Sequence, residues 1–474
     1  MKYLDVVVEN KSRHTDSFFT YRAPDETELR IGDKVWVPFG RGDKTKAGFV
    51  FAFPEHISCP EQKIKEIEGV DAAGSLNREM MKTAAWMKQR YAITYSDAIS
   101  CFCVKGNPPR EGKAKEPYKD LPGRDERPAA LTEEQTASVE CINEAIAASR
   151  HEIFLLHGVT ASGKTEVYME AIDKCLKLDK TAIMLVPEIA LTNQIMEHFI
   201  GRFGKDRLAV MHSKLTPRER YDEWHRIRSG RARIVIGARM GVFAPAENIG
   251  LIIMDEEHEA TYKSDMTPKY DTVEVAAKRL QTTGGVLLLG SATPSVVSYE
   301  RAKEGIYQLL TLKQRYNRNP LPRVEIVDMR EELRAGNTNI FSRRLYSAIE
   351  ETLKKGQQVI LFQNRRGYSN FVSCRACGAV MKCPECDLSL VYHKKEHAMI
   401  CHYCGRQFPL PETCPVCGSR YLKHFGIGTE QVEEAVAALF PKAALDRLDL
   451  DAVKQRKDLD AILRRFSQGK TDIL

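Results

Sequence analysis

The stretch FLLHGVTASGKTEVY, at residues 154–168, constrains the fold of this chain more than any other part of it. It sets the pattern G-x-x-x-x-G-K-T between an apolar run and an amphipathic segment. Glycines at both ends of such a loop let the backbone curl until successive N–H groups face one anion, and the following helix adds its dipole. The pattern therefore predicts a strand, a phosphate-binding loop and a helix of an α/β domain. The candidate nucleotide-binding residues of the loop are Gly158, Val159, Thr160, Ala161, Ser162, Gly163, Lys164 and Thr165.

A second apolar run further along the chain, LIIMDEEH, ends in acidic residues. In phosphoryl-transfer sites of this kind the lysine reaches the β- and γ-phosphates, and the threonine hydroxyl and a strand-end aspartate hold Mg²⁺. Asp255 would take that role, and Glu256 would accept a proton from the attacking water. His258 is either a sensor of the γ-phosphate or an ordinary polar residue. We therefore expect ATP and Mg²⁺ as cofactors, with these catalytic residues: Lys164, Thr165, Asp255, Glu256 and His258.

Apolar runs such as TAIMLVP, RIVIGA and GVLLLGSATPS alternate with longer amphipathic segments, which predicts a parallel sheet covered by helices. A second unit of this kind opens with QQVILFQNRRGY, is interrupted by cysteines and resumes near TDIL. The first residues read as short strands, LDVVVE and DKVWVPFG among them, before a helix with an apolar stripe. We expect a β-rich domain with a following helix at 1–104, a linker at 105–130, an ATP-binding lobe at 131–312, the start of a second lobe at 313–373, a cysteine-rich module at 374–420 and more of the second lobe at 421–474.

Eight of the thirteen cysteines form four C-x-x-C pairs within one window. Clustering of this kind in a reducing compartment favours a metal over disulfides. Eight thiolates suffice for two closed Cys₄ zinc sites, and four pairs can be combined in three ways. An iron–sulfur cluster is the rival, although the bacterial C-x₂-C-x₂-C run is absent. Free thiols or disulfides are further alternatives. The candidate ligands are Cys374, Cys377, Cys383, Cys386, Cys401, Cys404, Cys414 and Cys417.

The net charge of +7, from 71 basic and 64 acidic residues, is compatible with a nucleic acid partner but is weak evidence alone. No apolar run approaches the roughly 20 residues of a membrane span. The opening MKYLDVVVENKSRHTD has no apolar core of a signal peptide. We expect a cytoplasmic protein without a membrane partner.

The order of GxxxxGKT, DEEH and GSATPS is that of superfamily 2 helicases. Together with LVPEIALT, DEEHEATYK and LFQNRRGY followed by the four cysteine pairs, these motifs closely resemble the PriA family of bacterial replication-restart helicases over nearly the whole chain. The resemblance implies RecA-like lobes and an ATP-dependent 3′→5′ DNA helicase that recognises stalled or forked DNA and initiates primosome assembly. It also implies nested zinc sites, in which the first pair joins the fourth and the second joins the third. The implied partners are forked and single-stranded DNA with a free 3′ end, primosome proteins and single-stranded-DNA-binding protein.

The same resemblance assigns DNA and nucleotide contacts. Gln135 matches a glutamine that contacts adenine. Four positions match the pocket for a 3′ DNA end, although the family often has an acidic residue in place of the threonine: Phe19, Thr20, Gly40 and Lys65. A loop at 259–271 would offer stacking faces and phosphate contacts, and the RRGY turn would add two arginines. These residues are Tyr262, Lys263, Lys269, Tyr270, Arg365 and Arg366. The alternative for Gln135 is a lone polar residue at a helix start, and for the pocket, the loop and the basic turn it is an ordinary solvated surface.

Three features depart from the family. The linker at 105–130 is too short for the winged-helix domain that members usually carry there, and Val273 stands where the family has an arginine. The sequence also stops at SQGKTDIL, before the last two motor motifs. We therefore expect an incomplete second lobe, as in a C-terminally truncated member. The alternative function is a non-unwinding fork-recognition and primosome-scaffold fragment, and the cysteine module disfavours an RNA or chromatin motor.

Overall fold

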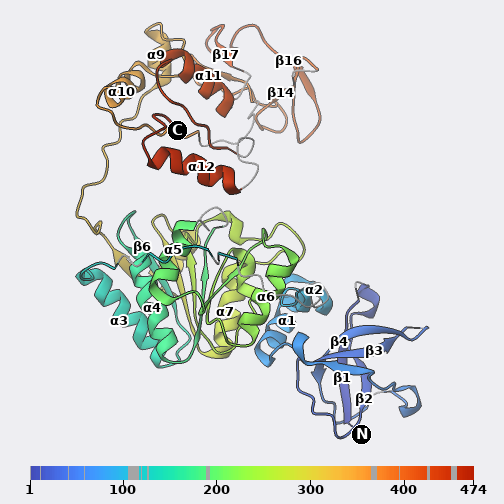
Figure 1. Cartoon of the computed structure of the whole chain (residues 1–474). Helices are drawn as coiled ribbons and strands as arrows, with labels where there is room; N and C mark the ends of the chain where they lie inside the picture. Colours follow the sequence, from blue (N-terminus) through green and yellow to red (C-terminus); the bar gives the residue numbers. More distant parts are fainter. Residues whose placement is uncertain are drawn as a thin grey trace. The chain divides into compact units, whose positions relative to one another are not determined.

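The computed structural model describes residues 2–10, 12–40, 42–57, 59–104, 117–118, 120–124, 127–187, 193–363, 371–393, 396–423, 428–449 and 456–474. The chain divides into two compact units, Met1–Leu321 and Pro322–Leu474, which Figure 1 colours along the sequence. Each unit has hydrophobic clusters of its own. Among the described residues no helix is both long and apolar enough to cross a bilayer.

The first unit opens with an antiparallel sheet in the order β2-β1-β4-β3-β5. Alternate residues of its strands, Leu4, Val6 and Val8 in the first of them, are buried in one small core. Val7 and Phe49, on the opposite face, are buried in the cluster that contains the next helix and the later parallel sheet, so side chains of both faces are covered. The strands expected near the N-terminus are confirmed, with these bounds: β1 (Lys2–Val8), β2 (Phe19–Ala23), β3 (Lys34–Phe39), β4 (Lys44–Ala52) and β5 (Gly69–Asp71).

Two helices follow the small sheet, α1 (Arg78–Tyr91) and α2 (Tyr95–Ser100). The apolar stripe of α1 lies in the same hydrophobic cluster as the parallel sheet that comes later in the chain. A buried ion pair strengthens this packing, since the Arg279 guanidinium donates 3.0 and 2.8 Å hydrogen bonds to the two carboxylate oxygens of Glu79. The helices therefore join the small sheet to the α/β core.

A parallel sheet in the order β12-β6-β11-β10-β7-β9-β8 forms that core. Along β6, Phe154 and Leu156 point into one hydrophobic cluster and Leu155 into another, because successive side chains of a strand alternate between faces. Both faces are covered, as expected for parallel sheets. The strands are β6 (Ile153–Gly158), β7 (Thr181–Leu185), β8 (Leu208–Met211), β9 (Ile234–Gly237), β10 (Ile249–Asp255), β11 (Val286–Ser291) and β12 (Gln308–Leu312).

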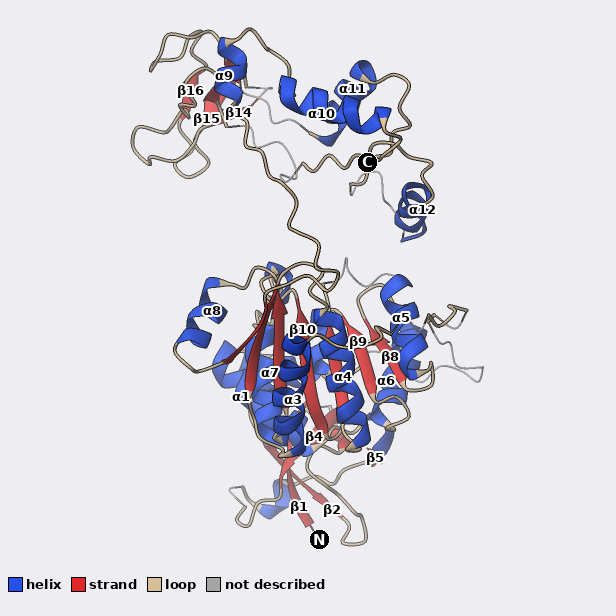
Figure 2. Ribbon diagram, turned by 90° about the vertical axis from the view of Figure 1, so that its left-hand side faces the viewer, coloured by secondary structure: helices blue, strands red, loops and turns tan. Residues whose placement is uncertain are grey.

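Helices flank this sheet on both sides (Figures 1 and 2), which confirms the predicted α/β class. Residues of α3, α4 and α5 fill one hydrophobic cluster, and residues of α6 and α7 fill the other together with α1. The bounds are α3 (Glu133–Ala147), α4 (Lys164–Lys177), α5 (Asn193–Phe203), α6 (Pro217–Arg228), α7 (Thr272–Thr283) and α8 (Val296–Lys303).

The second unit contains a helical part and a cysteine-rich part with separate hydrophobic clusters. Val359 and Leu445 each form a parallel bridge to Ile473, so the last residues do resume the strand pairing that the sequence predicted. The helices are α9 (Met329–Arg334), α10 (Arg343–Lys354), α11 (Thr429–Leu439) and α12 (Arg456–Ser467). The short strands are β13 (Ser373–Cys374), β14 (Val391–His393), β15 (Ala398–Ile400), β16 (Gln407–Pro409) and β17 (Leu422–Lys423).

Candidate functional site

The phosphate-binding loop lies between β6 and α4, as its sequence predicts. Gly163 is the N-cap of α4 with φ +80°, and a Cβ there would lie 2.2 Å from Nε2 of Gln135. A Cβ on Gly158 would lie 2.5 Å from Oγ of Ser162. A Cβ at either position would force a neighbouring side chain to shift, and at Gly163 the backbone conformation itself favours glycine. Within the described part of the chain no side chain caps α4, so the N–H groups of Lys164 and Thr165 remain available to an anion, whereas that of Glu166 donates to the Gly163 carbonyl.

Two side chains of the loop lack a strong partner of their own. The ammonium of Lys164 donates a 3.0 Å hydrogen bond to the Gly158 carbonyl, and Oγ of Ser162 is buried with no hydrogen-bond partner among the described residues. Thr165 is exposed in the first turn of α4. A phosphate group would supply acceptors for these donors, so the loop fits a nucleotide.

Gln135 lies directly behind the loop. Its side chain is fully buried; Nε2 donates a 2.9 Å hydrogen bond to the Ser162 carbonyl, and Oε1 accepts one from the backbone N–H of Thr132. The amide thus holds the loop against the start of α3. Its contact with adenine stays a prediction.

The acidic strand end lies at the same edge of the sheet. Asp255 is the last residue of β10, and its Oδ1 accepts a 2.9 Å hydrogen bond from the Tyr168 hydroxyl of α4. Burial raises the pKa of the Asp255 carboxyl, while the hydrogen bond from Tyr168 and the charge of Lys164 lower it. A carboxylate held in this way beside a lysine suits a divalent cation on a phosphate. No sequence pattern pointed to Tyr168, which occupies an ordinary position in a helix.

Glu256 follows with its backbone in the left-handed region, at φ +48°. Burial raises the pKa of its carboxyl, the Asp255 carboxylate raises it further, and the charge of Lys164 lowers it. A carboxyl group with a raised pKa next to a phosphate site is suited to accept a proton. The Nδ1 atom of His258 lies 2.8 Å from Oγ of Ser291 at the end of β11 and 3.6 Å from Oε2 of Glu256.

The loop at 259–271 differs from expectation in its tyrosines. Tyr262 and Tyr270 are 3% and 7% exposed, so neither ring offers the stacking face that we expected. The hydroxyl of Tyr262 donates hydrogen bonds of 2.7 and 3.0 Å to the carbonyls of Asp255 and Leu185, because the ring fills the core beneath the strand ends. Lys263 and Lys269, in contrast, are exposed.

Arg239 was missed in the sequence, yet it supports this loop. Its Nη1 donates hydrogen bonds of 3.1 and 2.5 Å to the carbonyls of Thr261 and Lys263, and its guanidinium lies 5.8 Å from the centre of the Tyr270 ring. Two contacts therefore hold the loop: the hydrogen bonds from Arg239 and the hydrogen bond from the Tyr262 hydroxyl to the Asp255 carbonyl.

The four residues matched to a 3′-end pocket lie in the N-terminal sheet and the segments beside it. The half-buried ring of Phe19 packs edge-on against Phe39 at 5.0 Å, and Thr20 donates a 2.8 Å hydrogen bond to Asp5. Exposed Gly40 has φ +84° after β3. The exposed ammonium of Lys65 pairs with Asp43.

Arg365 and Arg366 lie outside the described residues.

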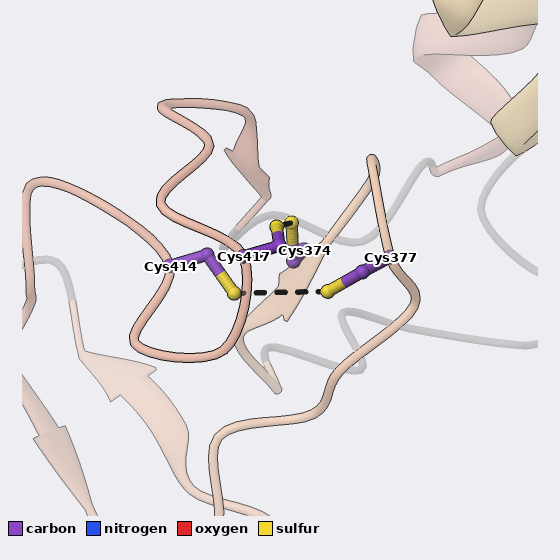
Figure 3. A group of neighbouring side chains, drawn as sticks. All are labelled: Cys374, Cys377, Cys414 and Cys417. Atoms are coloured by element: carbon purple, nitrogen blue, oxygen red, sulfur yellow. Dashed lines mark hydrogen bonds between the residues drawn. The ribbon is translucent and has the colours of Figure 1, made fainter.

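The eight cysteines form two groups, Cys374/Cys377/Cys414/Cys417 and Cys383/Cys386/Cys401/Cys404, with the sulfur atoms of each group within 4.8 Å of one another. This confirms the nested pairing. Figure 3 shows the first group, in which Sγ atoms of facing pairs are 3.6 and 3.7 Å apart. The edge of a zinc tetrahedron with 2.3 Å bonds is about 3.8 Å. The donor set and its spacing therefore fit two structural zinc ions.

All four C-x-x-C pairs share one backbone geometry. The residue after the second cysteine has a positive φ, and its N–H donates to the carbonyl of the first cysteine at 2.8 or 2.9 Å. Glycine fills this place three times and Asp387 once. In one pair, the backbone N–H groups of Cys404 and Tyr403 face the Cys401 sulfur and lower the pKa of its thiol.

Three family models match this chain. The 3′ DNA-binding domain model of PriA matches residues 5–103, a DEAD/DEAH box helicase model matches residues 132–302, and the cysteine-rich region model of PriA DNA helicase matches residues 383–409. The Replication restart protein PriA of Treponema pallidum is 38% identical over 469 residues, which cover 97% of this chain and 69% of that protein. The chain belongs to the PriA family.

Other members match a smaller share of their own length. The PriA protein of Bacillus subtilis is 49% identical over 360 residues, or 76% of this chain and 45% of the relative. The chain thus spans about half of that relative. Among solved structures, RecG bound to a three-way DNA junction aligns with 75% of this chain and 38% of its own, with 18% identity and a TM-score of 0.40.

Proposed function

We propose that this chain is part of an ATP-dependent DNA helicase that moves 3′→5′, recognises stalled or forked DNA and initiates primosome assembly for replication restart. The observation that carries the proposal is the 2.9 Å hydrogen bond from Tyr168, on the helix that begins at the phosphate-binding loop, to Asp255 at the acidic strand end. It brings the loop with Lys164 and the strand end with Asp255 and Glu256 to one edge of the sheet. This arrangement suits phosphoryl transfer to water.

Each residue of the nucleotide site has a distinct task in the proposed reaction. The loop N–H groups and Lys164 bind and orient the phosphates, and Glu256 accepts the proton of the attacking water. Thr165 and Asp255 would hold Mg²⁺, which neutralises developing charge on the phosphates when bound. His258 reports the state of the phosphates to the end of β11 through Ser291.

DNA would meet the chain at three places. Exposed Lys263 and Lys269 offer their charges to the backbone phosphates of single-stranded DNA. The pocket residues of the N-terminal sheet would receive the 3′ end; there Thr20 is already bonded to Asp5, so a carboxylate lies beside the proposed DNA end. Tyr262 and Tyr270 would act from beneath the loop rather than by stacking, and Arg365 and Arg366 remain proposed phosphate contacts.

The zinc module would act as a rigid projection that separates strands or binds partners. A module of this size has too small a core to fold without its metals, so zinc supplies the missing folding free energy. Primosome proteins and single-stranded-DNA-binding protein are the proposed partners.

A strand-displacement experiment separates the motor from the alternative of a non-unwinding scaffold. Partial duplexes carrying either a 3′ or a 5′ single-stranded tail are incubated with the chain and ATP. A 3′→5′ motor displaces the strand from the 3′-tailed substrate alone. A scaffold binds forked DNA but displaces neither strand.

A further inference from the structure

Glu257, the third residue of the DEEH run, has no task in the proposed reaction, yet its carboxylate accepts three hydrogen bonds. It is 6% exposed, and its carboxylate accepts hydrogen bonds from Ser295 N at 2.7 Å, Ser295 Oγ at 3.2 Å and Ser298 Oγ at 2.9 Å. Its own N–H donates to the Gly290 carbonyl at 3.1 Å. Every one of these partners belongs to β11 or to the start of α8.

On that side, Glu257 fixes the beginning of α8. Ser295 is the N-cap of the helix, and its Oγ also accepts from the N–H of Ser298. A carboxylate at a helix N-terminus is favoured by the helix dipole, and hydrogen bonds to an ionised acceptor are stronger than those between neutral groups. The segment 290–298 therefore cannot shift without breaking these bonds or carrying Glu257 with it.

On the other side, Glu257 fixes its neighbour Glu256. A residue with a side chain at φ +48° is strained, and such strain persists when the surrounding structure over-determines it. The turn is held by the bonds of Glu257 to β11 and α8 and by a 2.9 Å hydrogen bond from the N–H of Glu259 to the carbonyl of Glu256. Releasing Glu257 would let the Glu256 backbone relax and its carboxylate turn away from the phosphate site.

We propose that Glu257 is a positioning residue, which holds Glu256 in the geometry for hydrolysis and makes that geometry depend on the place of segment 290–298. The proposal rests on the proposed ATP hydrolysis. It assigns the coupling between the nucleotide site and α8 to one buried carboxylate, in addition to the contact between His258 and Ser291.

The test compares Glu257→Ala and Glu257→Gln with the matched control Ser138→Ala, which removes a buried serine hydroxyl that bonds within α3. We expect Glu257→Ala to lower kcat for ATP by about 10–100-fold, as loss of a supporting partner typically does, while KM changes less than about three-fold. Glu257→Gln keeps an acceptor oxygen for Ser295 N and should recover part of the loss. A kcat equal to that of the wild type in Glu257→Ala would overturn the proposal. So would a Glu257→Gln variant whose kcat is as low as that of Glu257→Ala.

Amide hydrogen exchange gives a readout that does not depend on activity. Loss of the carboxylate should speed exchange over residues 256–259 and 290–298, and Ser138→Ala should leave both segments unchanged. Absence of ATP turnover in the wild-type chain would contradict the proposed function. Unchanged amide exchange in Glu257→Ala would instead overturn the positioning role of Glu257. If Glu257→Ala does not fold, Glu257→Gln decides by the same two measurements.

Discussion

The Tyr168 hydroxyl reaches Oδ1 of Asp255 at 2.9 Å by passing over the α-carbon of Gly290, where an added Cβ would lie 1.7 Å from the hydroxyl oxygen. The helix that begins at the phosphate-binding loop thus orients the carboxylate at the end of another strand. Burial is the main reason why the pKa of Tyr168 is raised, so its proton stays in place as a donor.

We expect Tyr168→Phe to lower ATP turnover by about 10–100-fold, the usual cost of removing a partner behind a metal-binding carboxylate. The KM for ATP should change little, because the loop that binds the phosphates is untouched. Steady-state kinetics measure both. Tyr307→Phe is the matched control: Tyr307 is buried in the same unit, and its hydroxyl accepts a 2.7 Å hydrogen bond from Arg301. Equal turnover in the two variants would contradict the role of Tyr168.

Asp255→Asn should inactivate the site but stabilise the fold at neutral pH. Because burial raises the pKa of Asp255 in the folded state, the folded chain holds its proton at a pH where the unfolded chain has released it. The free energy of unfolding therefore falls as pH rises through that window and stays lower above it. Asparagine removes this penalty, so we expect a gain of about 0.5–2 kcal/mol at neutral pH.

Thermal denaturation at a series of pH values checks this prediction. The advantage of Asp255→Asn should shrink as the pH falls below the usual range of aspartate, where both states are protonated. Asp265→Asn, which changes an exposed carboxylate in the same unit, should follow the wild type throughout. A lower melting temperature for Asp255→Asn at neutral pH would contradict the expected penalty.

The purified chain should contain two zinc ions. Cys414→Ser should retain one, because Cys414 belongs to the first group, and the second group shares no ligand with it. Exposed Cys141 belongs to neither group, so Cys141→Ser should retain two. Elemental analysis after dialysis against a weak chelator measures the content. Iron in place of zinc, or loss of both ions from Cys414→Ser, would contradict two independent Cys₄ sites.

Gly418→Ala should weaken zinc binding at the first group by about 1 kcal/mol, or roughly five-fold, since alanine is disfavoured at its φ of +70°. Apart from Gly418 itself and its two chain neighbours, none of the described residues has an atom within 4 Å of the added methyl group, so the cost comes from the backbone alone. Competition with a chromophoric chelator measures the affinity. Gly42→Ala, also in open space, should match the wild type. Unchanged affinity in Gly418→Ala would show that the turn tolerates a side chain.

Local patterns were enough to predict the elements that carry the chemistry. Each of these motifs is short. The glycines and lysine of the loop are a few residues apart, the apolar strand runs directly into Asp255, and two residues separate the cysteines of each pair. The apolar runs on both sides predicted a parallel sheet, because buried strands read as continuous hydrophobic segments.

Contacts between distant segments could not be predicted in the same way. Tyr168 and Asp255 are 87 positions apart, and the bond of Gln135 to Ser162 spans 27. The buried state of Tyr262 depends on carbonyl acceptors at Leu185 and Asp255, which its own loop does not contain. An aromatic residue near a basic loop looks the same in sequence whether its ring faces solvent or core.

ATP turnover with and without a forked DNA that bears a free 3′ end tests the central claim most directly. The chain and Lys164→Ala are measured side by side at equal concentration. Our account predicts turnover that the forked DNA stimulates and that Lys164→Ala abolishes. Fork binding without any turnover in the wild-type chain, or equal turnover in Lys164→Ala, would contradict an ATP-driven motor built on this loop.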